Sequence, residues 1–253
     1  MVEGSVPGFG KKNFPKNYQV LVFFFPAYND SKSIALLVKK AYLVGLRISN
    51  RLQVIVVDDG SRDDTSEVLN KLKLKYPDLE VISHAKNKGY GGALRSGFRN
   101  SKNEWVFYTD GDGQYNVNEL IKLYSETLDK NIDVVNGYKG SRSDGIVRKI
   151  LGFFTNSLLH IIYDVPIRDI GCDFRLIRNS KLKKITLKSD SGLICLELVL
   201  KLRRKGAEFV DVEVSHLPRK YGKSEFFNRH HLQKTLKDQW EFWKKTRGGK
   251  LNY

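Results

Sequence analysis

Apolar and polar residues recur with two different periods along the first half of the chain. Short runs rich in Val, Ile and Phe have the composition of strands that are buried on both faces of a sheet. The segments between them carry apolar residues three or four positions apart, and several follow a Ser, Asp or Asn that can cap a first helical turn. The predicted strands are 19–25, 52–57, 79–83, 104–109 and 133–136, and the predicted helices are 31–44, 63–75, 91–101 and 117–128. This alternation predicts an α/β fold with a mostly parallel central sheet flanked by helices.

Polar and glycine-rich clusters follow the predicted strands. They are PAYND at 26–30, DDGSRDDT at 58–65, NKGYGG at 87–92 and DGDGQ at 110–114. Ligands of such sheets bind outside the carboxyl ends of the strands, so we expect the clusters to face one crevice. Carboxylates there can accept from ribose hydroxyls or a base N–H, and glycines or a helix N-terminus can receive phosphate. In the second cluster we expect Ser61 and Asp63 to cap a helix even if Asp59 binds a ligand.

Two aspartates one residue apart, Asp110 and Asp112, follow the fourth predicted strand. Their oxygens can converge on a hard cation, and Mg²⁺ or Mn²⁺ typically takes one or two carboxylates plus substrate phosphate oxygens. The alternative is a polar turn without a metal, because Asp and Gly are common in turns. A full EF-hand loop is excluded, since its third acidic position and closing Glu are missing. The acidic turn at Asp58 and Asp59 upstream favours the metal interpretation.

The order and spacing of these segments resemble family 2 glycosyltransferases. The matching segments are PAYN, VDDGSRDDT, NKGYGGA and DGDGQ, and the resemblance covers roughly residues 18–225. It is strongest to the dolichyl-phosphate mannose and polyprenyl-phosphate glucose synthases, because DIGCDFR at 169–175 and PRKYGKS at 218–224 also match. The resemblance implies the GT-A type fold of nucleotide-diphospho-sugar transferases. Other nucleotide-binding folds fit less well, since no Rossmann fingerprint follows the first strand and no Walker A loop is present.

The resemblance also implies roles for individual residues. It assigns a nucleotide-sugar to Pro26, Ala27, Tyr28, Asp30, Val57, Asp59, Gly89, Asp110, Gly111, Lys139 and Arg219. It assigns Mg²⁺ or Mn²⁺ to Asp110, Asp112 and Gln114, and a catalytic role to Asp110, Asp112, Arg219 and Lys139, the last two on the diphosphate.

Two positions depart from the family pattern. Lys139 stands where these synthases usually carry Arg, so a planar bidentate contact becomes a point charge. Lys223-Ser224-Glu225 stands where a Glu-Ser-Lys order is common, which leaves open whether Lys223 contacts phosphate.

The reaction implied is inverting, metal-dependent transfer of a hexose from a UDP- or GDP-sugar to a polyprenyl or dolichyl phosphate. Such an acceptor needs no strong base, because the second pKa of a phosphate monoester is about 6. The candidates for holding the acceptor phosphate are Arg148, Arg142, Arg175 and Ser224.

Two alternatives remain open. A glycosyltransferase acting on a sugar hydroxyl of a surface glycan would need a base, and Glu197 and Asp173 are the candidates. Their structural alternatives are ion pairs of Glu197 with Lys201 or Arg203, and of Asp173 with Arg175. A non-catalytic regulator that binds nucleotide-sugar is the third function class, although the Asp110, Asp112 and Gln114 set would then have no role.

Two apolar segments are candidates for membrane contact. Residues 147–162 form either a buried core helix or an interfacial helix, and its apolar side chains are Phe153, Phe154, Leu158, Leu159, Ile161 and Ile162. Residues 226–245 combine Trp240 and Trp243 with lysines, which suits either a docked helix or a lipid headgroup region.

No segment is expected to span a bilayer. The longest uncharged run, between Lys149 and Asp164, is shorter than the roughly 20 residues that a spanning helix needs, and no signal peptide is recognised. We expect an N-terminal extension at 1–17, a GT-A glycosyltransferase domain at 18–225 and a basic amphipathic helix and tail at 226–253. The protein is then cytoplasmic and peripheral on the cytoplasmic face of a membrane. Whether a separate membrane subunit supplies the acceptor stays open.

Charge narrows the choice of partner. The 253 residues include 44 Lys and Arg against 28 Asp and Glu, a formal net charge of +16, which attracts polyanions. The basic residues are dispersed and no nucleic-acid module is recognised, so an anionic membrane surface is the expected partner and nucleic acid is not. Cys172 and Cys195 are expected to be buried free thiols. The five histidines lack metal-ligand spacing and are expected to be solvated or in the core, with His216 ordering the loop before Arg219.

Overall fold

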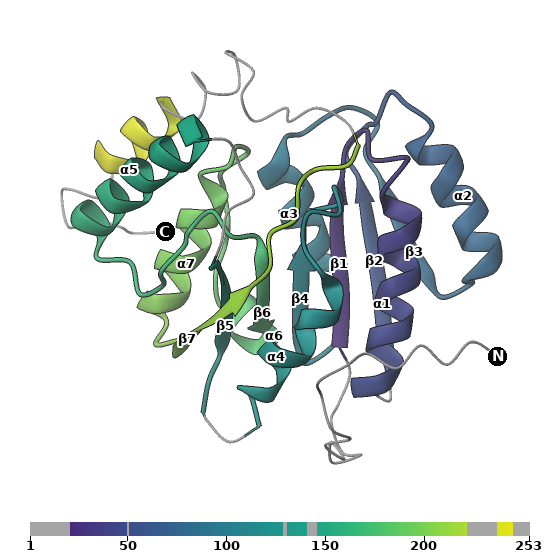
Figure 1. The fold of residues 1–253 in the computed structure, drawn as a ribbon, viewed down its shortest axis with the longest axis horizontal. Coiled ribbons are helices and arrows are strands. Elements are labelled where there is room, and N and C mark those ends of the chain that lie inside the picture. The colour runs from purple at the N-terminus through teal and green to yellow at the C-terminus, as the bar shows by residue number, and fades with distance from the viewer. Residues whose placement is uncertain (1–20, 50, 129–130, 141–145, 222–236, 245–253) are drawn as a thin grey trace.

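The computed structural model describes residues 21–49, 51–128, 131–140, 146–221 and 237–244. Its centre is a seven-stranded sheet in the order β3-β2-β1-β4-β6-β5-β7 (Figure 1). Only β6 runs antiparallel to its neighbours in this sheet, so the mostly parallel sheet expected from the sequence is confirmed. The strands are β1 (Leu21–Ala27), β2 (Leu52–Asp58), β3 (Leu79–Ser83), β4 (Trp105–Thr109), β5 (Val134–Lys139), β6 (Phe174–Arg178) and β7 (Phe209–Val214).

Helices cover both faces of the sheet. One face packs against α1 (Ile34–Ile48), α2 (Thr65–Lys75), the 3-10 turn η1 (Val117–Glu119) and α4 (Leu120–Ser125). The other packs against α3 (Tyr90–Asn100), α5 (Ile146–Tyr163), α6 (Asn179–Leu182) and α7 (Ile194–Arg204). Because side chains alternate along a strand, Phe23 and Phe24 of β1 enter different cores, where they pack edge-on against Phe107 and Phe98 respectively. Burial on both faces explains why the strands are continuous apolar runs.

The predicted strands and helices of the first half are present with small shifts at their ends. Strand β1 continues through Pro26 and Ala27, which the sequence pattern places after the strand, and β5 continues to Lys139. The predicted helix 117–128 is an η1 turn followed by a short α4. Strands β6 and β7 were not predicted, although the alternation of apolar and polar residues in FVDVEV at 209–214 is a readable strand signal.

The antiparallel strand β6 explains how distant segments meet at one edge of the sheet. Phe174, which begins β6, pairs with Thr109, which ends β4, so the loop at 169–173 lies beside the Asp110 turn. Val214, which ends β7, pairs with Lys139 at the end of β5. The segment that follows β7 therefore starts at the same edge. In the part of the chain that the structure describes, no helix combines the length and apolarity needed to cross a membrane.

Candidate active site

The turn after β4 lies directly against the end of β1. The N–H of Gly111 donates to the carbonyl of Pro26 at 3.1 Å, and a Cβ at Gly111 would lie 2.7 Å from that oxygen and 2.9 Å from Oδ2 of Asp30. Only glycine fits this approach. Asp112 accepts a hydrogen bond from the N–H of Gln114 at 2.9 Å, so the turn chemistry considered as an alternative from the sequence is also present.

Several carboxylates crowd this turn. Burial raises the pKa of Asp110 well above its ordinary value, and the charges of Asp173 and Asp112 raise it further. Burial, with the charge of Asp112 added, raises the pKa of Asp30 to about 7. Burial is the main cause of both shifts and the neighbouring carboxylates add to it, so a divalent cation at this turn would relieve part of the cost of ionising these groups. Among the described residues no group of three or more His, Cys, Asp or Glu is arranged to hold a metal, so the protein offers two carboxylates rather than a full cage.

The segment after β7 crosses this turn and brings in a cation. Arg219 donates to Oδ2 of Asp112 at 2.6 Å. The backbone N–H of Leu217 donates to the carbonyl of Gln114 at 2.8 Å, and the Gln114 side-chain amide donates to the Leu217 carbonyl at 3.1 Å. His216 forms a bridge with Tyr115, so its expected role in ordering the loop before Arg219 has a structural basis.

The loops after β1 and β2 are tied to each other. Asn29, in the left-handed conformation at φ 56°, donates its N–H to Oγ of Ser61 and accepts from the N–H of Arg62. Ser61 therefore joins the two loops instead of capping α2, contrary to expectation. The N-cap of α2 is Asp64, which makes no capping bond through its side chain; Asp63, one residue earlier, accepts from the N–H of Thr65 at 3.0 Å and so satisfies the first N–H of the helix. A cavity of about 160 Å³ lies beside these loops, lined by Asn29, Asp30, Ser31, Lys32, Ser33, Asp63 and Tyr221.

Two residues predicted to contact the nucleotide-sugar are already packed within the protein. Val57 is 0% exposed in the core, between its strand partners Pro26 and Ile82. Gly89 has its open face against the carbonyl of Asp190, and the N–H of Gly91 donates to the same oxygen at 3.0 Å. Close packing against the loop at 188–191 accounts for these glycines. Apart from Lys139 and Arg219, the other members lie at the carboxyl ends of β1, β2 and β4; they are Pro26, Ala27, Tyr28, Asp30, Asp59, Asp110 and Gly111.

Lys139 lies at the same edge but is directed at the loop before β6. Its ammonium donates to the carbonyl of Gly171 at 2.7 Å and lies 3.8 Å from Asp169, and the side chain is 10% exposed. This placement orients the loop at 169–171 beside the acidic turn.

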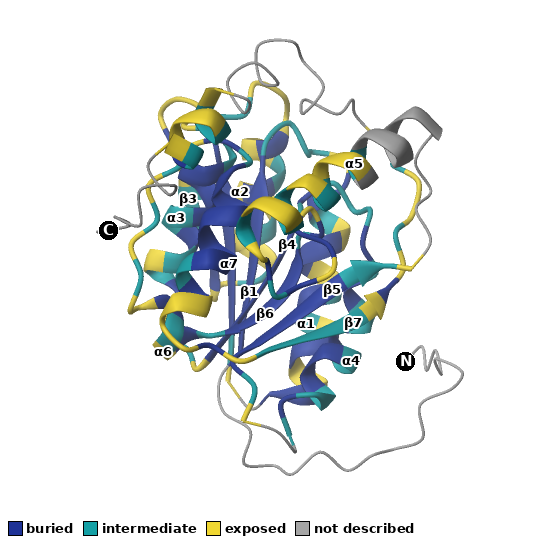
Figure 2. Ribbon diagram, turned by 90° about the vertical axis from the view of Figure 1, so that its left-hand side faces the viewer, coloured by how far each residue is buried: buried dark blue, intermediate teal, exposed yellow. Residues whose placement is uncertain are grey.

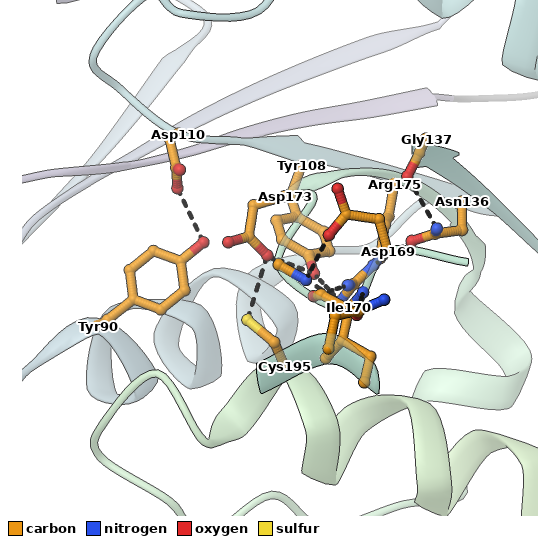
Figure 3. A network of polar contacts seen from close by, with 12 residues as sticks. Tyr90, Tyr108, Asp110, Asn136, Gly137, Asp169, Ile170, Asp173, Arg175 and Cys195 are labelled. Carbon is orange, nitrogen blue, oxygen red and sulfur yellow. Dashed lines mark hydrogen bonds and ion pairs between the residues drawn. The ribbon is translucent and has the colours of Figure 1, made fainter. Parts of the chain in front are cut away.

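Figure 3 shows a buried polar network behind the acidic turn. Arg175 is 0% exposed, and its guanidinium donates to Asn136 at 2.6 Å, to the Tyr108 hydroxyl at 2.8 Å and to the carbonyl of Ile170. Its donors are thus directed at protein groups in the interior. We assign Arg175 a structural role in place of the acceptor contact expected from the sequence.

The network continues through Asp173 towards the site. Oδ1 of Asp173 accepts from the thiol of Cys195 at 3.1 Å and lies 3.4 Å from the Tyr108 hydroxyl. Arg175 lies 4.0 Å from Asp173, so the ion pair considered from the sequence is present. Burial and the charge of Asp173 raise the pKa of Cys195, and both cysteines are buried free thiols as expected.

Tyr90, which the sequence did not single out, donates its hydroxyl to Oδ1 of Asp110 at 2.8 Å (Figure 3). The aromatic residue within the glycine-rich segment NKGYGG is the signal that could have identified it.

Glu197 is a structural residue and not a base. Its carboxylate accepts from the backbone N–H groups of Lys188 and Ser189 and from the Lys201 ammonium at 2.6 Å, as one sequence alternative predicted. Although burial opposes ionisation, the bonds from Lys201 and Ser189 lower the pKa of Glu197 below its usual value. Arg203, the other proposed partner, pairs with Asp164.

The structure does not describe the side chains of the other three candidates for the acceptor phosphate. Arg142 and Ser224 lie outside the described residues, and Arg148 lies in α5 in a stretch whose side chains are not described. Their predicted contact with an acceptor phosphate stays a prediction.

Helix α5 has one packed face and one exposed apolar face (Figure 2). Leu159 and Tyr163 pack against the core, and Tyr163 contacts Phe242 of the helix at 237–244 with ring centroids 5.8 Å apart. The exposed side chains are Phe154 (65%), Leu158 (55%), Ile161 (82%) and Ile162 (42%). Trp240, 55% exposed, stacks on Trp243 in the neighbouring helix. One face of α5 therefore packs on the core, as the first sequence alternative expects, and membrane contact through the exposed apolar face stays a prediction.

Residues 23–186 match the family model described as "Glycosyl transferase family 2". An uncharacterized protein of Methanocaldococcus jannaschii is 30% identical over 206 residues, which cover 77% of this chain and 87% of that protein. An undecaprenyl-phosphate 4-deoxy-4-formamido-L-arabinose transferase of Edwardsiella ictaluri is 26% identical over 213 residues, 83% of this chain and 64% of that protein.

The curated transferases are longer than this chain, which spans about half to two thirds of their length. Among solved structures, a mannosyltransferase of Pyrobaculum calidifontis in complex with GDP-mannose and Mn²⁺ superposes with a TM-score of 0.64 at 18% identity, over 91% of this chain and 65% of that one.

Proposed function

The chain belongs to glycosyl transferase family 2 and has the GT-A type fold, and we propose that it transfers a hexose from a UDP- or GDP-sugar to a polyprenyl or dolichyl phosphate. The observation that carries the proposal is the acidic turn at Asp110 and Asp112 faced by Arg219 at the ligand edge of the sheet. Relatives named as lipid-phosphate sugar transferases support the acceptor class.

The donor site is built from the residues gathered at this edge. Asp110, Asp112 and Gln114 would hold a Mg²⁺ or Mn²⁺ ion, and the solved mannosyltransferase in complex with Mn²⁺ supports the use of a divalent cation. Such an ion, when bound, neutralises charge on the departing diphosphate. Arg219 is placed to move from Asp112 onto the diphosphate, since its guanidinium already lies on the same turn. Lys139, at the end of β5, supports this end of the site by holding the loop at 169–171 through the carbonyl of Gly171.

The acceptor phosphate needs orientation rather than a base. An ionised phosphate oxygen attacks the anomeric carbon as the bond to the diphosphate breaks, and a single in-line displacement inverts the configuration. The pKa of Glu197 is lowered and its carboxylate is engaged by Lys201, which agrees with an enzyme that does not use it as a base.

The exposed face of α5 provides the membrane contact in this proposal. A strip made of Phe154, Leu158 and Ile161, together with the exposed Trp240 of the helix at 237–244, suits a helix that lies in the headgroup region of an anionic leaflet. The acceptor's lipid chain would then stay in the bilayer while its phosphate reaches the site from the cytoplasmic face.

Transfer to a sugar hydroxyl is the second candidate function. The observation that favours it is Asp173, a carboxylate that lies close enough to Asp110 to raise the pKa of that residue and that could serve as a base. The two candidate functions are distinguished by whether turnover requires a lipid phosphate or a sugar hydroxyl as the acceptor.

The decisive experiment measures nucleoside diphosphate release from a panel of UDP- and GDP-sugars with Mg²⁺ or Mn²⁺, with and without polyprenyl phosphate in detergent. Turnover that requires the lipid phosphate and is lost in Asp112→Asn would support the proposal and identify the donor. Turnover that ignores the lipid but falls in Asp173→Asn would favour a hydroxyl acceptor. Nucleotide binding without any turnover would favour a binding protein.

A further inference from the structure

Three side chains form a chain of hydrogen bonds behind the donor edge. Nδ1 of His84 lies 2.6 Å from Oδ1 of Asp59, and Nε2 of His84 lies 2.9 Å from Oγ of Ser96. His84 is 8% exposed and Asp59 is 4% exposed. A neutral ring that donates from Nδ1 and accepts from the Ser96 hydroxyl at Nε2 satisfies both contacts. Helix α3, which carries Ser96, is thereby coupled to the end of β2.

Within the described residues, the hydrogen bonds to the Asp59 carboxylate go to Oδ1 and not to Oδ2. Oδ1 also accepts from the backbone N–H of Lys88 at 2.9 Å, while no hydrogen bond from the described residues goes to Oδ2. The next residue, Gly60 at φ 70°, packs against residues 86 and 87, where a Cβ would lie 2.8 Å from the N of Asn87. Asp59 therefore has a single orientation, with both bonds on one oxygen.

We propose that His84, held by Ser96, is a positioning residue for the nucleotide site that includes Asp59: by fixing Oδ1 of Asp59 it sets the orientation of Oδ2, and with it how strongly the site prefers the UDP or GDP of the proposed donor. The inference rests on the proposed donor site. A carboxylate only accepts, so it pairs with N3–H of uracil or N1–H of guanine. The corresponding atoms of cytosine and adenine are acceptors and would leave two acceptors facing each other, a mismatch that costs affinity because neither group is satisfied.

A purely structural role for His84 predicts something different. His84 also donates its backbone N–H to the carbonyl of Asp58 at 2.9 Å, so the ring could simply hold the loop after β3 against β2. Loss of such a support would weaken the binding of all four nucleotides by the same factor. A positioning role predicts that the ratio between nucleotides changes.

The test is calorimetric binding of UDP, GDP, CDP and ADP, each with Mn²⁺, to the wild type and to three variants. We expect the wild type to bind UDP or GDP at least about tenfold tighter than CDP and ADP. His84→Ala should weaken the preferred nucleotide about tenfold and reduce that ratio to about threefold or less. His84→Asn should restore most of the ratio, because its amide nitrogen replaces Nδ1 as the donor to Asp59. Ser96→Ala should give an intermediate ratio, since it removes only the outer hydrogen bond.

Ser125→Ala is the matched control, because Ser125 donates within α4 to the carbonyl of Lys122. Melting temperatures identify the folded variants, and His84→Asn and Ser96→Ala carry the test if His84→Ala does not fold. An unchanged ratio in the folded His84 and Ser96 variants, or a ratio that His84→Asn does not restore, would overturn the inference. Failure of the wild type to bind any of the four nucleotides would instead count against the proposed function.

Discussion

Arg219 and Asp112 form an ion pair of 2.6 Å between the segment after β7 and the turn after β4. The pair is largely buried, with 27% of the arginine side chain and 10% of the aspartate side chain exposed. The same carboxylate is a proposed metal ligand, so in the free protein the Arg219 guanidinium neutralises the charge on Asp112 that a bound metal ion would otherwise neutralise.

Arg219→Ala should separate metal binding from turnover. We expect turnover to fall about 10²- to 10³-fold, because an oriented cation on the diphosphate is lost. Binding of Mn²⁺ to the free protein should stay the same or tighten, since Asp112 loses its competing partner. Electron paramagnetic resonance of Mn²⁺ and a release assay measure the two effects.

A matched control for this experiment is Arg203→Ala, which removes an arginine that also pairs with an aspartate at 2.6 Å, but outside the site. It should change neither quantity. Weaker Mn²⁺ binding in Arg219→Ala would contradict the assignment.

Asp30 should make the stability of the metal-free protein depend on pH. Its pKa is raised to about 7 in the folded state, whereas an unfolded aspartate titrates near 4. Between these values the folded state binds a proton that the unfolded state has lost, so stability falls as pH rises from 4 to 7 and then levels off.

Asp30→Asn removes this titration and keeps an oxygen for the N–H of Tyr28. Its free energy of unfolding in urea with EDTA should exceed that of the wild type by on the order of 2–4 kcal/mol at pH 8 and match it near pH 4. A variant that is no more stable than the wild type at pH 8 would show that the carboxyl is not strained by burial.

Arg175→Met should destabilise the fold. Three groups, Asn136, Tyr108 and the carbonyl of Ile170, lose a donor in the interior, and we expect a loss of about 3–5 kcal/mol in urea unfolding. The matched substitution Arg178→Met, three residues further along β6 with 25% of the side chain exposed, should cost less. If Arg175→Met is as stable as the wild type but loses affinity for lipid phosphate, then the acceptor role expected from the sequence would be correct.

The exposed face of α5 should control lipid binding. The triple substitution Phe154→Ser, Leu158→Ser, Ile161→Ser should reduce cosedimentation with anionic liposomes by about tenfold or more, because three exposed apolar side chains no longer enter the interface. Binding of the nucleotide should not change. Serine at Leu36, Leu43 and Leu46, exposed leucines of α1, is the matched control and should leave sedimentation as it is. Equal losses in both triples would show that α5 has no special role.

The sequence predicted five of the seven strands of the sheet because their signal is local. Apolar runs such as 52–57 and the helical periods between them are set by neighbouring residues, so β1 to β5 and α1 to α4 followed from one pass along the chain. The acidic turn and its neighbours could be placed at one edge for the same reason, since parallel strands end together. The family resemblance added the roles of Asp110, Asp112 and Arg219, and the structure shows that these three lie at one edge.

Only the tertiary structure decided the partners of side chains that are distant in the chain. Arg175 lies in a segment that matches the family, and the sequence made it a candidate for the acceptor phosphate. The pairing of β6 with β4 and β5 instead buries its side chain among Tyr108, Asn136 and Ile170. The sequence suggested that the glycines at 89 and 91 could receive phosphate, whereas the loop at 188–191 packs against the faces where a Cβ would lie. His84 showed no spacing pattern, because its partners Asp59 and Ser96 lie 25 and 12 residues away and meet it only when β2, β3 and α3 pack together. Periodicity records which face of an element is buried, whereas the identity of the neighbour on that face depends on the topology of the whole sheet.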